Sequence, residues 1–232
     1  MSDDFDCFYV LFECISQLDL IIAFSKYVLI QESCVKPTFD YREVKILNSF
    51  HPILHKFHNM RESRNKYTSQ IRNYEKFINA SVRSIENDIE LSANRPFMLL
   101  TGANMSGKST YLKQMGLLQV MAQCGSFVPA SGSAKFVMIK QVFSRLGSDC
   151  DLSLNASSFE SEMLEMNYIL NKMVKANSLT LIDELCRSTN IYEGLALCFA
   201  ICEHMLKRFH ASNQKGTKTF VLFTTHLKEL AY

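Results

Sequence analysis

The sequence of 232 residues has no pair of cysteines in a C-x-x-C arrangement, although it contains eight cysteines. Cys198 and Cys202 are spaced to share one face of a helix, but no histidine and no second cysteine pair completes a set of zinc ligands. This absence favours free buried thiols over a structural zinc site. Free thiols are typical of a reducing compartment, the cytosol or the nucleus.

An excess of one charge is also absent. Lysine and arginine number 25 against 23 aspartate and glutamate residues, so the formal net charge is +2 at pH 7. A balance this close to neutral neither indicates nor excludes nucleic acid as a partner. Hydrophobic residues make up 47% of the chain and charged residues 21%, which is ordinary for a globular core and argues against wholesale disorder.

The N-terminus lacks the features of a secretory signal. It opens with Asp3, Asp4 and Asp6 instead of basic residues, and no small-residue cleavage site follows. Glu13 and Asp19 interrupt the apolar run that comes next. We therefore expect this run to be too short to span a bilayer, and we expect no membrane partner.

The order of apolar segments indicates the fold class. Apolar side chains three and four residues apart predict a helix over 8–28, with one face packed on another part of the protein. Short β-like segments follow over 35–54, and strands then alternate with helices. Strands are expected at 97–101, 135–139, 141–146, 179–182 and 220–224, and helices at 109–123, 159–173 and 192–209. This alternation predicts an α/β fold with a mostly parallel sheet covered by helices on both faces.

A glycine-rich segment directly follows the strand at 97–101. It reads TGANMSGKST and matches the pattern G-x-x-x-x-G-K-[ST]. Gly102 and Gly107 let the backbone turn tightly, so that successive N–H groups converge on phosphate oxygens, and the helix that follows adds the positive end of its dipole. Lys108 is expected to reach the β- and γ-phosphates of ATP, and the Ser109 hydroxyl to bind Mg²⁺. The predicted phosphate loop comprises Gly102, Ala103, Asn104, Met105, Ser106, Gly107, Lys108, Ser109 and Thr110.

Two carboxylates end a buried strand about 75 residues after Lys108. The segment LTLIDE places Asp183 and Glu184 where a strand of a phosphate-loop protein approaches the loop. Asp183 would then help to hold Mg²⁺, and Glu184 would act as the general base for the attacking water. An apolar run that ends in Asp-Glu is common by itself. The start of a surface helix would explain these two residues equally well. The spacing from Lys108 favours the catalytic interpretation.

Two further segments are less specific. The segment FVLFTTH predicts a buried strand that ends in His226, a position from which a histidine can contact the γ-phosphate or the attacking water. A histidine with ordinary hydrogen-bond partners explains that residue equally well. Ser157 and Ser158 open a predicted helix, where serine is an ordinary N-cap, so alone they predict capping only.

Together these segments resemble the ATPase domain of the MutS family of DNA mismatch and recombination proteins. The matching segments, in the family's order and at its spacing, are TGANMSGKSTYLKQ, SSFESEM, LTLIDELCRSTN and FTTHLKEL, and HPIL at 51–54 resembles the domain's start. The resemblance implies a P-loop NTPase of the ABC type, with a mostly parallel central sheet flanked by helices. It assigns 34–232 to this domain, truncated at its C-terminal end, and 1–33 to the last helix of a truncated lever region.

The resemblance also implies roles for individual residues. Asn104 would approach the γ-phosphate, and His226 would sense it. Phe77 resembles the aromatic residue that stacks on adenine. Ser157 or Ser158 would reach the nucleotide of a partner subunit, which implies a dimer with composite ATP sites, usually a heterodimer of two MutS-family proteins.

The function implied by the resemblance is that of an ATPase module that switches a dimeric DNA clamp. Ser106 and the segment 111–114 are most similar to the meiotic members of the family, which implies a role in crossover formation in the nucleus, with DNA held by regions outside this sequence. A mismatch-repair member and a nucleotide-binding module with weak catalysis are the alternatives. A transport-type ATPase does not fit, because no LSGGQ-like segment precedes the acidic strand.

The sequence departs from the family pattern at four positions. Ala103 replaces a usual proline, and Glu160 replaces a usual methionine. Cys186 and Ser188 replace glycines that form a tight turn, so we expect a positive φ and backbone strain there. This departure bears on the rate of hydrolysis and on subunit pairing more than on nucleotide binding.

Overall fold

The structure is a computed structural model that describes residues 2–31, 33–55, 85–147, 158–187, 189–214 and 216–231. Its helices are α1 (Ser2–Ile30), α4 (Lys108–Gln123), α5 (Ser158–Lys172) and α6 (Ile191–Gln214), with a short 3₁₀ helix η2 (Lys228–Ala231). Its strands are β1 (Thr38–Asp40), β2 (Glu43–Ser49), β3 (Asn87–Ser92), β4 (Phe97–Thr101), β5 (Ala134–Val137), β6 (Gln141–Arg145), β7 (Ser178–Asp183) and β8 (Thr219–Thr225). The expected elements from residue 97 onward are present within a few residues of their predicted bounds.

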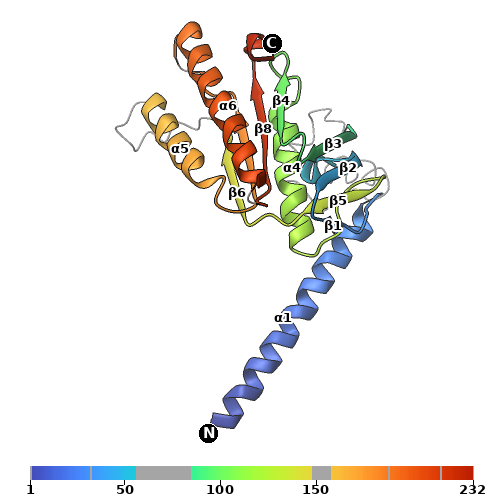
Figure 1. The fold of residues 1–232 in the computed structure, drawn as a ribbon. Coiled ribbons are helices and arrows are strands. Elements are labelled where there is room, and N and C mark those ends of the chain that lie inside the picture. The colour runs from blue at the N-terminus through green and yellow to red at the C-terminus, as the bar shows by residue number, and fades with distance from the viewer. Residues whose placement is uncertain are drawn as a thin grey trace.

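The strands form two sheets (Figure 1). One has the order β4-β8-β7-β6, and all of its neighbours run parallel. The other has the order β1-β5-β2-β3, and in it β2 runs antiparallel to both β3 and β5. The expectation of an α/β fold is confirmed, but the expectation of one mostly parallel sheet holds only for the first group. Of the four strands of the second sheet, only β3 was not expected, because β3 offers only two apolar side chains, Ile89 and Leu91, between polar neighbours.

Helices cover both faces of the parallel sheet, as expected. Side chains of β7 and β8 alternate between the faces, because successive residues of a strand point to opposite sides. Leu181 joins a core with α4 and the second sheet, whereas Ile182 joins a core with α5 and α6. In Figure 1, α4 stands between the two sheets and α5 and α6 lie on the opposite side of the parallel sheet. The parallel sheet is therefore packed on both faces.

Ile182 offers a test of this packing. Its side chain is fully buried, and it directly precedes Asp183 in the sequence. Ile182→Val is expected to lower the free energy of unfolding by about 1 kcal/mol, because it deletes one buried methyl group. Ile191→Val is the matched control, since Ile191 is 72% exposed, and it should leave stability unchanged. Chemical denaturation measures both, and equal effects of the two changes would contradict the packing described.

The N-terminal helix differs from expectation. It extends away from the rest of the molecule in Figure 1, and the residues expected on a packed face, among them Phe8, Leu18 and Ile22, are about half exposed or more. The expectation that the apolar run is too short to span a bilayer is wrong. Cys7–Ile30 has 24 residues and a hydropathy of 1.8, long and apolar enough to cross a membrane, because two acidic residues lower the mean hydropathy too little. Length and composition alone are weak support for a span, and the absence of a membrane partner stays a prediction.

The cysteines of the described residues are all free thiols. Cys186 and Cys198 are buried, as expected, but Cys7, Cys14 and Cys124 are exposed. Cys7 and Cys14 are exposed because they lie on α1. No group of three or more His, Cys, Asp or Glu side chains that could hold a metal occurs in the part of the chain that the structure describes.

Candidate active site

The glycine-rich loop joins the end of β4 to the start of α4. Gly107, just before α4, has a φ of +98°, a left-handed conformation that glycine adopts without steric cost. Gly107 offers no side chain to cap the helix, so N–H groups of the first turn of α4 are open to an anion. The Lys108 side chain is buried, and its Nζ donates hydrogen bonds to the carbonyl oxygens of Gly102 (2.9 Å) and Ala103 (2.8 Å). The loop thus places an ammonium group and free backbone donors side by side.

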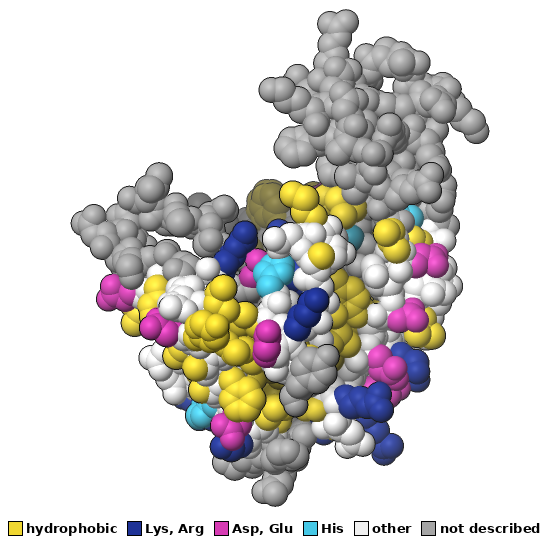
Figure 2. All heavy atoms as spheres, turned by 90° about the horizontal axis from the view of Figure 1, so that it is seen from above, with side chains coloured by type: hydrophobic (Ala, Val, Ile, Leu, Met, Phe, Trp, Pro, Cys, Tyr) yellow, Lys and Arg dark blue, Asp and Glu magenta, His cyan; other side chains and the backbone are white. Residues whose placement is uncertain are grey.

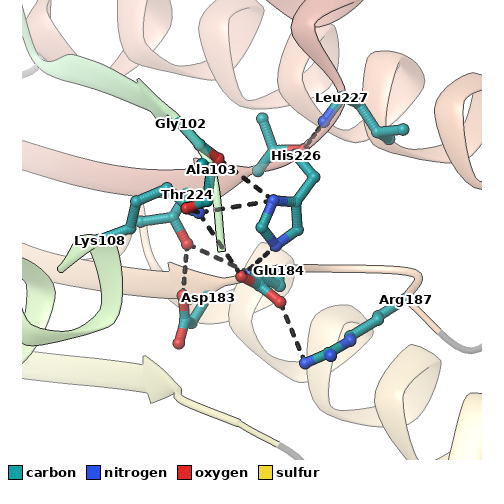
Figure 3. A network of polar contacts seen from close by, with 10 residues as sticks. Gly102, Ala103, Lys108, Asp183, Glu184, Arg187, Thr224, His226 and Leu227 are labelled. Atoms are coloured by element: carbon teal, nitrogen blue, oxygen red, sulfur yellow. Dashed lines mark hydrogen bonds and ion pairs between the residues drawn. The ribbon is translucent and has the colours of Figure 1, made fainter. Parts of the chain in front are cut away.

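The acidic strand end lies opposite this loop (Figure 3). Asp183 is the last residue of β7, and its Oδ1 accepts a 2.5 Å hydrogen bond from the Thr224 hydroxyl of the neighbouring β8. Glu184 follows with a φ of +50°, and its backbone N–H donates to the Thr224 carbonyl at 3.1 Å. The Glu184 Oε1 lies 3.8 Å from the Lys108 Nζ. The fold therefore brings Lys108 and Glu184 together, although they lie 76 positions apart in the sequence.

His226 joins the loop to the acidic turn. It follows β8, and its Nε2 forms an ion pair or hydrogen bond with Glu184 Oε1. Its Nδ1 lies 3.2 Å from the Gly102 carbonyl oxygen and 3.5 Å from the Lys108 Nζ. When Nε2 alone carries a proton, Nδ1 can accept from Lys108, whereas a doubly protonated ring donates from Nδ1 to Gly102. His226 thus lies between the loop and the acidic turn, and its contact with the γ-phosphate stays a prediction.

Two residues of this network, Arg187 and Thr224, were not predicted from the sequence to belong to the site. The Arg187 Nη1 lies 3.3 Å from Glu184 Oε2, so basic side chains approach both oxygens of this carboxylate. Thr224 holds Asp183 through its hydroxyl and Glu184 through its carbonyl. Arg187 lies three residues from Glu184, a spacing that could have suggested the ion pair. Thr224 gave no local signal, because its role follows from the register of β7 against β8.

The residues present fit a magnesium ion. Mg²⁺ binds oxygen ligands and is held in such sites by one or two carboxylates together with phosphate oxygens and water. The Thr224 hydroxyl donates a hydrogen bond to Oδ1 of Asp183 and so orients this carboxylate. Thr224 donates no hydrogen bond to the other oxygen, Oδ2. Ser109 lies in the first turn of α4 and carries a second suitable oxygen. Two protein ligands suit a metal that also binds phosphate, and Asp183 and Ser109 stay the predicted pair.

A cavity of about 760 Å³ opens beside the loop. This volume is within the range of small-molecule sites. His51, Asn87 and Tyr111 form part of its wall, and they come from three different parts of the chain. The predicted loop residues that also line it are Gly102, Met105, Ser106, Gly107, Lys108 and Thr110. Figure 2 looks from above at this end of the molecule, where basic, acidic and histidine side chains gather among hydrophobic ones.

Several predicted site residues do not line this cavity, including Asp183, Glu184 and His226. Ala103, Asn104 and Ser109 belong to the loop and the first turn of α4 but are not part of the cavity wall. Phe77 and Ser157 lie outside the described residues. Ser158 begins α5, but the position of its side chain is outside the described part of the structure.

The turn after Glu184 has the conformation expected from the missing glycine. Cys186 has a φ of +62° and is buried. A side chain in this left-handed region is costly, by about 1–2 kcal/mol. Interaction with the Cys198 thiol lowers the pKa of Cys186. The strain expected at Cys186 is therefore present in the fold, and Ser188 lies outside the described residues.

Comparison with known proteins identifies the family. The model of MutS domain V matches residues 98–232, which is more than half of the chain. Human MutS protein homolog 4 is 37% identical over 226 residues, 97% of this chain and 20% of that protein. The mouse protein of the same name is 36% identical over 226 residues, with the same two coverages. The DNA mismatch repair protein MutS of Shouchella clausii is 37% identical over 217 residues, 93% of this chain and 21% of that protein.

The chain spans about a fifth of the length of these curated relatives. The match to domain V begins within β4 and includes the loop, the acidic strand end and His226. The resemblance expected from the four sequence segments is thereby confirmed. This chain belongs to the MutS family, and residues 98–232 match its domain V.

Proposed function

We propose that this chain binds ATP with Mg²⁺ at the phosphate loop and hydrolyses it, as a P-loop NTPase of the ABC type. The observation that carries the proposal is the convergence of Lys108, Glu184 and His226, which follow three different strands of the parallel sheet. Parallel strands present their carboxyl ends at one edge, where ligands of open α/β sheets bind. Lys108 and the first N–H groups of α4 would hold the β- and γ-phosphates.

Glu184 is the proposed general base. Its side chain is only 17% exposed, and its carboxylate is held by His226 and Arg187. In this position it would accept the proton of a water molecule that attacks the γ-phosphorus. Mg²⁺, when held by Asp183 and Ser109, supplies neutralisation of the charge on the phosphate oxygens. His226 would contact the γ-phosphate from its place between Lys108 and Glu184, and Asn104 would approach it from the loop.

The nucleoside is proposed to occupy the cavity beside the loop. Tyr111 and His51 line this cavity and could contact a base or sugar. Burial raises the pKa of the Tyr111 hydroxyl to about 12, so the group stays protonated, and it donates a 2.7 Å hydrogen bond to the Asp88 carbonyl. Tyr111 is therefore a fixed wall of the cavity. Phe77 stays the proposed adenine-stacking residue.

We further propose that the complete protein is a DNA-binding dimer in which ATP binding and hydrolysis switch a clamp. DNA would contact regions outside this sequence, and the partner would be another MutS-family subunit that receives Ser157 or Ser158 at its nucleotide. The identity to MutS protein homolog 4, together with Ser106 and 111–114, supports a role in meiotic crossover formation in the nucleus. A mismatch-repair role is the alternative, supported by the similarity to bacterial MutS.

Turnover of ATP by the purified chain tests the enzymatic proposal. Phosphate release is expected in the presence of Mg²⁺ and should stop when EDTA removes the metal. Binding of ATP should be measured separately by calorimetry, so that binding and catalysis are distinguished. Tight binding of ATP with no turnover in the unmodified protein would contradict hydrolysis but not nucleotide binding.

A nucleotide-binding module with weak catalysis is the second candidate, and the left-handed Cys186 favours it. The double change Cys186→Gly and Ser188→Gly separates the candidates. Under our proposal kcat should change less than about threefold, because Cys186 already adopts the conformation that glycine permits. A large rise in kcat, measured by phosphate release, would instead favour the weakly catalytic module.

A further inference from the structure

Glu162 is a buried carboxylate that the proposed mechanism does not use. It lies on α5 and is only 5% exposed. Burying a charged group costs free energy unless it is paired and hydrogen-bonded. Its Oε1 accepts a 3.2 Å hydrogen bond from the backbone N–H of Cys186 and lies 3.5 Å from the Arg145 Nη2 at the end of β6. The carboxylate therefore links α5, β6 and the turn that follows Glu184.

That turn needs external support. Glu184 and Cys186 both have positive φ values, +50° and +62°. Non-glycine residues in this region cost about 1–3 kcal/mol each and persist only when surrounding groups fix them. On one side, the backbone N–H of Glu184 donates to the Thr224 carbonyl of β8. On the other side, the backbone N–H of Cys186 donates to Glu162. The general base is held between these two anchors.

We propose that Glu162 is a positioning residue that sets the turn carrying Glu184 and thereby couples the position of α5 to ATP hydrolysis. This inference rests on the proposed role of Glu184 as general base. Arg145 offsets the cost of burying Glu162 and also pairs with Glu165 one turn further along α5, at 2.9 Å. A displacement of α5 would withdraw Glu162 from Cys186, so the turn would relax and Glu184 would lose its place.

The test compares variants of Glu162 with a matched neighbour. Glu162→Met removes the acceptor for Cys186 and is expected to lower kcat about tenfold to a hundredfold, with the Kd for ATP changed less than threefold, because a misplaced catalytic group loses rate without losing substrate. Glu162→Gln keeps an acceptor oxygen and should lose less than fivefold. Glu165→Gln is the control: Glu165 pairs with the same arginine but not with the turn, so its kcat should stay within twofold.

A second readout does not depend on activity. Exchange of the Cys186 amide hydrogen, followed by NMR, should become at least tenfold faster in Glu162→Met, while the amides of β8 keep their protection. Unchanged kcat together with unchanged Cys186 exchange would overturn the inference. If the unmodified protein has no turnover, the proposed function fails, and amide exchange still tests the hold of Glu162 on the turn.

A folding control keeps the test decisive. Thermal melting followed by circular dichroism shows whether Glu162→Met is folded. If it is not, Glu162→Asp takes its place, because it keeps the charge but shortens the reach towards Cys186 by one methylene. A loss of kcat and faster Cys186 exchange in this variant support the inference, and wild-type values of both overturn it.

Discussion

Glu184→Gln is expected to reduce Mg²⁺-dependent ATP turnover by at least about a hundredfold, the lower range for removal of a general base. Glutamine has the shape of glutamate and can still accept a hydrogen bond from His226, which contacts the carboxylate in the structure. It cannot accept the proton of the attacking water. The Kd for ATP should therefore change less than threefold, so that the loss lies in kcat.

Single-turnover hydrolysis and calorimetric binding measure the two quantities. The matched control is Glu203→Gln, because Glu203 is an exposed residue of α6 that pairs only with Lys207 among the contacts found in the described residues. Its turnover should equal that of the unmodified protein. Retention of more than half of the turnover by Glu184→Gln would exclude Glu184 as the base.

Lys108→Ala should have an effect of similar size, but on binding. The Lys108 ammonium is buried at the loop with the Glu184 carboxylate 3.8 Å away. Removing one member of a buried, hydrogen-bonded charge pair costs about 2–5 kcal/mol, and an ATP phosphate would be the other member here. The Kd for ATP is therefore expected to rise by about a hundredfold or more.

Calorimetric titration with ATP and Mg²⁺ checks this expectation. Lys135→Ala serves as the control, because Lys135 is half exposed and pairs with Glu43 in the second sheet, away from the loop. It should bind ATP like the unmodified protein. If a folded Lys108→Ala protein binds ATP normally, the nucleotide must bind at another place in the structure.

The parts of the site that could be predicted from sequence are those that depend on a short, continuous sequence pattern. The loop, α4 and the acidic strand end are each local patterns of glycine, apolar and charged residues, and their bounds agree with the structure. The positive φ of Cys186 could also be predicted, because a family glycine marks a conformation that other side chains resist. The positive φ of Glu184 carried no such signal.

The contacts that could not be predicted join residues far apart in the chain. Thr224 meets Asp183 across 41 positions because β8 pairs with β7 in one register, and no local pattern states that register. Glu162 meets Cys186 across 24 positions because α5 packs on that face of the sheet. The apolar spacing of α1 predicted a packed face, yet periodicity does not say which surface, or whether any surface among the described residues, covers it.

A crystal structure of this chain with Mg²⁺ and a non-hydrolysable ATP analogue tests the central claim most directly. The account predicts the γ-phosphate within hydrogen-bonding distance of the Lys108 Nζ, with the metal beside Asp183 and Glu184 facing the γ-phosphorus. A nucleotide bound elsewhere, with Lys108 still donating to the carbonyl oxygens of Gly102 and Ala103, would contradict it.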